Sequence, residues 1–413
     1  MRYVRFACAI SGFLLFGCGS NGPAAPDPVN GAGAQAGKSS GQQGGSGGML
    51  ATGGSAGEAG TYSGGMAQGG SSGTSGGATS GGATSAGMAG ATSCPGGVTP
   101  PSGTAPALVP GEWTNISPPG LYRPRGSVPP YGVMDVHSVR CSPYTLYVLT
   151  DVEGLWKSMD GGSTWSLIGN LPSPNSPGVM ALDPSDPAHL YLVGGVRGAS
   201  LGFWVSSDGG ETWAQPKSFT DGANNSEEGW TNDVYQVAAD PADFKHVLLT
   251  FHSGFAFKAD AGLLESTDGG ESWKRHAPQA NWGAGSGISF LNDRNTWLLA
   301  TQGGGYFRTS DAGATWAHVS SENSMHGACI GFFSEAGILY VGANNQILRS
   351  SDMGVSFDTT GPYGSDGYYQ VIGDGNFLYA QISNTGANSM GPQPYITSPD
   401  GDGQNWTSYN EQT

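Results

Sequence analysis

Short hydrophobic runs separated by polar turns occupy the chain from about residue 133 onward. The runs are rich in β-branched and aromatic residues, which is typical of β-strands. The first group predicts strands at residues 133–139, 144–149, 154–158 and 164–168, and the second at residues 179–182, 190–193, 203–206 and 212–215. No segment has the periodicity of an amphipathic helix, so the sequence predicts an all-β protein.

An eight-residue motif follows the third strand of each group and recurs along the chain. Its copies are SMDGGSTW, SSDGGETW, STDGGESW, TSDAGATW, SSDMGVSF and SPDGDGQNW, with aspartates at Asp160, Asp208, Asp268, Asp311, Asp352 and Asp400. We expect each carboxylate to accept hydrogen bonds from backbone N–H groups one and two residues on, while glycine supplies positive φ. Six such aspartates cannot all be catalytic, and one aspartate per copy is too few oxygen ligands for calcium, so their predicted role is structural.

The spacing of these aspartates, 41 to 60 residues, suits one four-stranded blade of a β-propeller. Further innermost strands are predicted near residues 234–238, 287–290, 329–333 and 369–372, which makes six complete blades. Residues 112–116 resemble an outer strand without a blade of its own. Either the ring closes with six blades, or this strand completes a seventh blade whose other three strands are missing at the C-terminal end.

The six copies resemble the Asp-box (BNR) repeat of sialidases, sortilin-type receptors, xyloglucanases and photosystem-assembly-factor-like propellers. The resemblance covers about residues 112–406 and implies a propeller fold. It does not imply one activity, because these families include both enzymes and binding proteins. The sialidase branch is disfavoured, since Tyr122-Arg123-Pro124 lacks the isoleucine of that family's Arg-Ile-Pro motif.

The N-terminal part predicts export. Arginines precede an apolar run at residues 6–16, which is too short to span a membrane, and Gly17-Cys18 follows it. Residues 1–17 resemble a bacterial lipoprotein signal, with Cys18 as the lipidated residue, and this implies an outer-membrane or cell-surface lipoprotein. Residues 18–105 are rich in Gly, Ser and Ala and are expected to form a disordered tether. The propeller is expected at residues 106–413.

The amino-acid composition limits the classes of partner that the chain is expected to bind. The chain has 32 Asp and Glu against 16 Lys and Arg, which disfavours nucleic acid, and a membrane is expected only through the lipid anchor. The 11 Trp and 16 Tyr favour a neutral extracellular polysaccharide or a surface protein as partner of a monomer. The histidines lack metal-ligand spacing, so we expect no metal and no cofactor. The chain has five cysteines. One lies in the signal and another is Cys18, so Cys94, Cys141 and Cys329 remain. Because three is an odd number, they cannot form a complete disulfide framework.

A ligand face is expected where loops enter the innermost strands and join the second to the third strands. Aromatic, carboxylate and imidazole side chains there are suited to stacking on sugar rings and bonding their hydroxyls. The candidates are Glu153, Glu227, Glu228, Trp230, Trp282, His326, Tyr368 and Tyr369. The aromatic members of this set could equally shield the ends of the innermost strands.

Residues 150–156, TDVEGLW, are similar to the xyloglucanase segment Thr-Asp-Val/Ile-Gly-Gly. That resemblance implies Asp151 as general base, although Glu153 replaces a glycine. The enzymes use two tandem propellers, and an inverting pair of carboxylates must lie about 6.5–9.5 Å apart. No motif identifies the acid. The sequence therefore favours a binding module for glycan or a surface partner, with a glycoside hydrolase using Asp151 as the alternative and a scaffold or assembly factor as the third hypothesis.

Overall fold

The computed structural model describes residues 114–120, 133–139, 142–150, 153–168, 171, 178–194, 202–220, 234–251, 262–279, 282–324, 331–334, 336–362, 367–373, 377–382, 395–398 and 403–409. All belong to one of two compact units, Met1–Ser20 with Ser85–Thr413. The other unit, Asn21–Thr84, lies outside the described residues, as do the expected signal, Cys18 and tether. Within the described part, no helix is long and apolar enough to cross a membrane.

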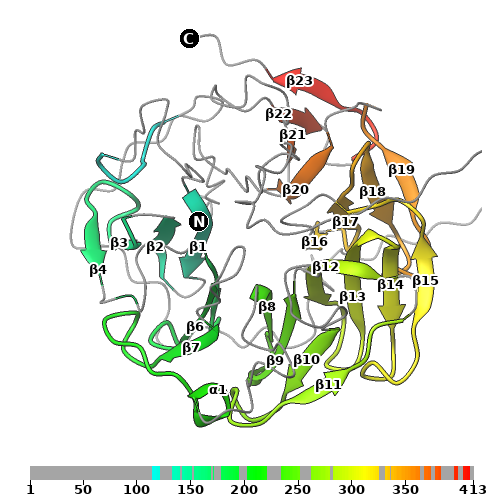
Figure 1. Ribbon diagram of the computed structural model, residues 1–413. Helices are drawn as coiled ribbons and strands as arrows, with labels where there is room; N and C mark the ends of the chain where they lie inside the picture. Colours follow the sequence, from blue (N-terminus) through cyan, green and yellow to red (C-terminus); the bar gives the residue numbers. More distant parts are fainter. Residues whose placement is uncertain are drawn as a thin grey trace, which may run out of the picture. The chain divides into compact units, whose positions relative to one another are not determined.

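The described residues form a six-bladed β-propeller of antiparallel sheets that follow one another in chain order (Figure 1). In Figure 1 the first strand of each blade lies towards the middle and the last lies at the rim. The first three blades contain β1 (Val133–Val139), β2 (Ser142–Thr150), β3 (Leu155–Ser158) and β4 (Ser166–Ile168); β5 (Gly178–Leu182), β6 (Leu190–Gly194) and β7 (Gly202–Ser206); and β8 (Val234–Asp240), β9 (Asp243–Phe251), β10 (Leu263–Ser266) and β11 (Lys274–His276).

The last three blades each have four strands. They contain β12 (Gly283–Phe290), β13 (Trp297–Gly303), β14 (Gly305–Thr309) and β15 (Ala317–Ser320); β16 (Phe332–Phe333), β17 (Leu339–Gly342), β18 (Ile347–Ser350) and β19 (Asp358–Thr360); and β20 (Tyr368–Gly373), β21 (Leu378–Ile382), β22 (Tyr395–Ser398) and β23 (Thr407–Tyr409). The all-β propeller predicted from the sequence is thereby confirmed, with the innermost strands close to their expected positions.

The second blade departs from the prediction of an outer strand at residues 212–215. Only one bridge, between Val205 and Ala214, is present, and the chain then enters the single-turn helix α1 (Lys217–Thr220). Pro216 would stand opposite Phe203 in the next rung of the ladder, and proline has no N–H to donate there. The predicted strand at residues 112–116 is also absent from the described part, in which residues 114–118 carry no strand assignment.

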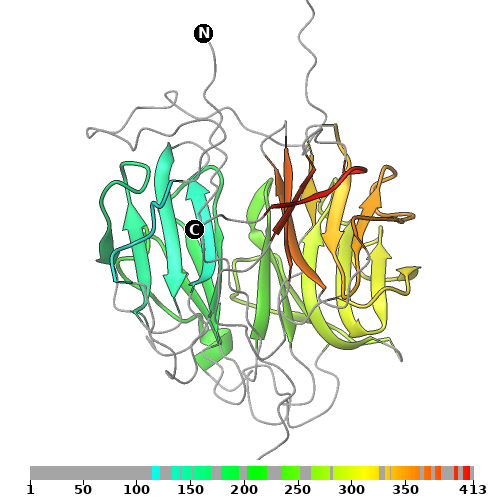
Figure 2. The same ribbon diagram turned by 90° about the horizontal axis from the view of Figure 1, so that it is seen from above.

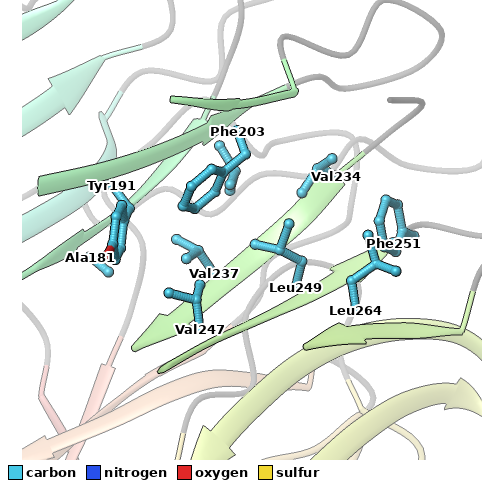
Figure 3. Close-up of a cluster of buried hydrophobic side chains, with 10 residues drawn as sticks. Ala181, Tyr191, Phe203, Val234, Val237, Val247, Leu249, Phe251 and Leu264 are labelled. Carbon is cyan, nitrogen blue, oxygen red and sulfur yellow. The ribbon is translucent and has the colours of Figure 1, made fainter. Parts of the chain in front are cut away.

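Hydrophobic clusters fill five successive interfaces between neighbouring blades, because the middle strands of each blade are apolar on both faces. Figure 3 shows the cluster between the second and third blades, where Tyr191 and Phe203 meet Val237, Val247 and Leu249. Full burial of one such side chain contributes about 1.5–3 kcal/mol. The sheets are therefore held together mainly by contacts with the next sheet.

The repeated motif forms a turn between the third and fourth strands, which we call the aspartate turn. In the first copy, Ser158 Oγ donates to Asp160 Oδ1 at 2.9 Å and accepts the Gly162 N–H at 2.8 Å. Asp160 also accepts the backbone N–H and the hydroxyl of Thr164 at 2.8 and 2.7 Å. The aspartate thus binds the residue four positions on, not the N–H groups one and two positions on that the sequence analysis expected.

The same hydrogen bonds recur in the turns that contain Asp208, Asp268, Asp311 and Asp352. Asp400 lies outside the described residues. Where the fourth and fifth copies lack the first glycine, Ala312 and Met353 adopt φ of 53° and 60°. Positive φ is strained for these residues, so the hydrogen bonds of the turn hold the backbone against its own preference.

Ser206→Ala should lower the free energy of unfolding by about 1–3 kcal/mol, the cost of leaving a buried N–H unpaired. Ser206 Oγ is the acceptor for the buried Gly210 N–H, at 2.9 Å, and donates to Asp208. Urea unfolding measures the effect. Ser207→Ala is the matched control, because Ser207 is exposed, and equal stability of the two variants would contradict a structural role for the turn.

Candidate functional site

The propeller has two chemically different sides. The aspartate turns join third to fourth strands on one side, and the turns between second and third strands lie at the opposite ends of the strands. Figure 2 shows the blades from the side, with their strands running between these two sides of the propeller. The expected ligand face is the side opposite the aspartate turns.

Most of the predicted ligand-face residues lie outside the described part of the chain. Asp151, Glu227, Glu228, Trp230 and His326 are among these, and Tyr369 belongs to β20 without a described side chain. Glu153, Trp282 and Tyr368 are described. The structure places these three in three different blades, so they do not by themselves form a common pocket.

Trp282 precedes β12 and is only 3% exposed. Its ring lies edge-on to Trp316, with centroids 5.0 Å apart, and is tilted against Phe307 at 5.9 Å. Trp316 is the aromatic residue of the fourth aspartate turn. Trp282 therefore occupies the shielding position that the sequence analysis left as the alternative, and a sugar could stack on it only after its neighbours moved.

Tyr368 is likewise buried, at 3% exposure, and its hydroxyl donates to Pro362 O at 2.8 Å. Its backbone N–H donates to Ala343 O, and Asn344 N–H donates to Asn323 O. These bonds connect loops of the fourth, fifth and sixth blades on the expected ligand face. Tyr368 is thus a support for that face, and its hydroxyl is already engaged within the protein.

Thr150 and Gly154, which flank the segment with Asp151, are hydrogen-bonded to each other. Thr150 N–H donates to Gly154 O at 2.9 Å, and Gly154 N–H donates to Thr150 Oγ1 at 3.0 Å. The fourth blade has a related contact, from Thr301 Oγ1 to Gly305 O at 2.8 Å. Glu153, inside the first of these turns, is half-buried. These bonds fix the backbone at Thr150 and Gly154, and Asp151 itself lies outside the described residues.

The carboxyl groups of the aspartate turns are strongly stabilised as anions. Hydrogen bonds from Thr212 lower the pKa of Asp208 to about 2, and those from Thr315 lower the pKa of Asp311 to about 2. In Asp160 and Asp268, slight burial opposes the effect, yet the hydroxyl and backbone donors still lower the pKa. Such groups accept hydrogen bonds at all working pH values and have no proton to give.

A buried group of ionisable side chains lies in the third blade. Glu265 accepts from His246 Nε2 at 3.1 Å and from His276 Nε2 at 2.9 Å, and Asp240 lies 3.4 Å from the other nitrogen of His246. Burial would raise the pKa of Glu265, but the two histidines outweigh it and lower the pKa to about 2. No described set of His, Cys, Asp or Glu has the geometry of a metal site.

This group supports packing on the aspartate-turn side. His276 lies under the fourth turn, where a Cβ on Gly313 would come within 2.6 Å of the His276 ring. Its ring also meets the Trp297 ring edge-on at 5.5 Å. The sequence analysis did not predict this buried ionisable group. Its sequence signal was the presence of His246, Glu265 and His276 within the strands of the third blade.

Asp135 and His137 form a second pair that sequence analysis missed. Two residues apart on β1, they share a face of the innermost strand. Asp135 Oδ2 accepts from His137 Nε2 at 2.9 Å and from the Met180 N–H of the second blade at 2.7 Å. The pair joins two innermost strands. Its signal was two polar residues within an otherwise apolar strand, VMDVHSV.

The His137 side chain is 31% exposed. Burial of the ring opposes protonation, but the charge and hydrogen bond of Asp135 outweigh it and raise the pKa of His137 above 6.5. The raised pKa favours an ion pair between His137 and Asp135 at mildly acidic pH.

Known structures share this fold at low identity. A GH74 xyloglucanase from Xanthomonas campestris matches with a TM-score of 0.49 and 19% identity, over 68% of this chain and 45% of its own. YCF48 bound to D1 peptide matches with 0.44 and 18%, over 67% and 81%. A GH74 enzyme from Niastella koreensis matches with 0.36 and 16%, over 69% and 51%.

The chain thus spans less than half the length of the Xanthomonas xyloglucanase. No family model and no curated protein matches the sequence. At these identities and TM-scores the likenesses carry no information on activity or ligand.

His137 should add stability that depends on pH. Because its pKa is raised by folding, this contribution is fully present below pH 6.5 and is lost as pH rises through the folded-state pKa. The stability difference between wild type and His137→Gln should therefore be larger at about pH 5.5 than at about pH 8.5. Urea unfolding at both pH values measures it. Asp135→Asn removes the charge that raises the pKa of His137, so this pH-dependent contribution should disappear in that background. If His137→Gln still had a pH-dependent effect in the Asp135→Asn protein, the pairing of the two residues would be contradicted.

Proposed function

We propose that this protein is an exported, lipid-anchored Asp-box propeller that binds an extracellular glycan or a surface partner. The observation that carries the proposal concerns its carboxyl groups. Every described Asp or Glu with a shifted pKa is shifted downward: Asp160, Asp208, Glu265, Asp268, Asp311 and Asp352. A glycosidase needs a carboxyl group that keeps its proton near neutral pH. None of these six groups meets that need.

Each of these carboxylates also has a structural task. The turn aspartates bind the hydroxyl and N–H of the residue four positions on, and Glu265 holds two buried histidines. The scaffold therefore supplies rigidity, and recognition is left to the loops on the side opposite the aspartate turns. Rigid scaffolds with variable loops are a common design for binding.

The partner is inferred from composition. The formal net charge of −16 disfavours polyanions, while 12% charged residues and many Trp and Tyr favour a neutral, hydroxyl-rich ligand. Trp230 is the candidate to stack on a sugar, and Glu227 and Glu228 are the candidates to bind its hydroxyl groups. A surface protein with neutral polar groups is the other partner of this chemistry.

A glycoside hydrolase is the second candidate function. The observation that favours it is the pair of hydrogen bonds between Thr150 and Gly154, which flank the segment that contains Asp151. An aspartate in this segment could act as a base and activate water if an acid faced it. The resemblance of residues 150–156 to the xyloglucanase segment supports the same candidate.

Purified protein should bind a neutral polysaccharide and release no reducing sugar from it. Trp230→Ala should weaken retention by about 1–3 kcal/mol, the scale of one lost stacking contact. Affinity electrophoresis against a polysaccharide panel, with a reducing-sugar assay in parallel, measures both. Trp282→Ala is the matched control, because this buried ring should affect stability and leave the affinity of folded protein unchanged.

Hydrolysis by the wild type that falls about 10²–10⁴-fold in Asp151→Asn would overturn the binding proposal, since that is the usual contribution of a general base. Retention by no polysaccharide would reject a glycan ligand. The proposal would then rest on a protein partner alone.

Anchoring should depend on Cys18. Only its thiol can carry the lipid, so Cys18→Ser should move the protein from the membrane fraction to the soluble exported fraction. Cys8→Ser is the matched control, because Cys8 lies inside the apolar run, and it should leave the distribution unchanged. Membrane retention of the Cys18 variant, measured by immunoblot after fractionation, would reject the lipoprotein assignment.

A further inference from the structure

Short connections on the expected ligand face of the fourth, fifth and sixth blades are hydrogen-bonded to one another. Asn323, in the segment that leads into the fifth blade, accepts the Gly303 N–H on its side-chain oxygen at 3.1 Å. Its backbone oxygen accepts the Asn344 N–H at 2.9 Å, and Asn344 O accepts the Gly367 N–H, just before β20, at 2.8 Å. These bonds form one continuous support across three blades.

The turn between β17 and β18, residues 343–346, is held on both sides by this support. Ala343 N–H donates to Gln346 O at 2.9 Å, which closes the hairpin. Ala343 O also accepts the N–H of Tyr368, the first residue of β20, at 2.8 Å. Together with the two backbone bonds of Asn344, these contacts fix the backbone of the turn.

Asn344 and Asn345 form the tip of this hairpin, although the turn does not require asparagine at either position. Asparagine is frequent in two-residue hairpin turns because it tolerates positive φ. Among the described residues, however, the non-glycine positions with positive φ are Ala312 and Met353. Within the same part of the chain, neither asparagine side chain makes a hydrogen bond, since the bonds of Asn344 come from its backbone. The two carboxamides therefore have no task in shaping the turn.

Two glutamines flank this pair. Gln346 ends the same turn, and Gln302 precedes Gly303 between β13 and β14. All four carboxamide side chains are half-buried, and we call them the carboxamide shelf: Gln302, Asn344, Asn345 and Gln346. Gly303 is exposed, and a Cβ there would have no described heavy atom within 4 Å. The fourth-blade end of the shelf thus borders open space.

The chemistry of the shelf is neutral. A carboxamide has one acceptor oxygen and two N–H donors, so it matches a hydroxyl group, which also donates and accepts. In the described segments that build the shelf and its support, residues 302–304, 321–324 and 343–346, the one charged residue is Glu322. Neutral donors and acceptors give no advantage to a charged ligand, so the shelf fits the hydroxyl-rich class named above.

The backbone of these turns disfavours an extended peptide as ligand. A peptide that adds a strand to a sheet bonds to free main-chain N–H and C=O groups. Here the N–H groups of Gly303, Asn344 and Gly367 already donate within the protein. Recognition at the shelf is therefore left to side chains, and neighbouring carboxamides suit the closely spaced hydroxyl groups of a sugar ring.

We propose that the carboxamide shelf binds hydroxyl groups of a neutral polysaccharide across the fourth and fifth blades. This inference rests on the proposed function and adds residues that recognise the sugar. Asn344 and Asn345 form the centre of the shelf, because their turn has the fixed backbone. Gln302 and Gln346 extend it on either side, and Asn323 supports both turns.

Affinity electrophoresis of the purified 413-residue chain tests the shelf, with soluble neutral β-glucan, mannan and xylan as probes. Asn344→Ala, Asn345→Ala and Gln302→Ala should each weaken retention about 2–10-fold, the scale of one neutral hydrogen bond. Asn292→Ala is the matched control and should have no effect. Asn292 is exposed between β12 and β13, on the side of the aspartate turns. Urea unfolding checks that every variant is folded.

O-methylation of the retained polysaccharide tests the hydroxyl contact itself. A methyl ether keeps an acceptor oxygen and loses the donor proton, so the wild type should bind the methylated polymer about 3–10-fold more weakly. The Asn344→Ala/Asn345→Ala double variant lacks two of the acceptors for these protons and should discriminate less between the two polymers. Equal discrimination by the folded double variant and the wild type would overturn the proposal.

The two experiments distinguish failure of the shelf from failure of the proposed function. Equal retention of the wild type and all shelf variants would overturn the shelf and leave glycan binding in place. Retention by none of the three polysaccharides would overturn both. Binding of an uncharged peptide that Asn345→Ala abolishes, without retention by any polysaccharide, would assign the shelf to a protein partner and likewise overturn the proposal.

Discussion

The fold depends on the contact between each aspartate turn and the blade before it. Each sheet is short and apolar on both faces, and one such repeat cannot bury its hydrophobic faces without a neighbour. The turn aromatic and its glycines lie on the middle strands of the preceding blade, as Trp273 and Gly270 lie on Phe203. The hydrogen bonds of the aspartate lie within its own turn, as those of Asp268 with Ser266 and Ser272 do. The aspartate therefore fixes the shape of the turn that packs on the preceding blade.

The third interface shows that the contact can be made with different chemistry. Tyr147, Tyr191 and Tyr340 of the first, second and fifth blades lie beneath the following turn, and the third blade has Leu248 at the same register. His276 fills that place under Gly313, and Glu265 fixes its orientation. A buried ionised carboxylate costs desolvation energy, which here is offset by two histidine donors. The Phe290 ring lies edge-on to His246, and the Trp297 ring lies edge-on to both His246 and His276.

Much of the fold could be predicted because its sequence signals are local and recur in every blade. The position of each aspartate turn fixes where the third strand ends, and the apolar runs before it fix the first and second strands. The exceptions have non-local or single-residue causes. Pro216 stops the ladder of the second blade, and α1 then provides Ser218 for Trp273, a substitution that no strand pattern encodes. The Asp135 bond to Met180 links residues 45 apart in sequence, so only the packed ring reveals it.

The candidate site was less predictable for a related reason. Sequence identifies residue types near a face, but burial decides which of them can meet a ligand. Trp282 and Tyr368 have the composition of a sugar platform, yet one is enclosed by Phe307 and Trp316 and the other bonds Pro362. Both lie at the ends of innermost strands, where exposed apolar rims would cost free energy. If the protein binds a ligand as proposed, the aromatic candidates that remain are those outside the strand ends, because Trp282 and Tyr368 are used to complete the core.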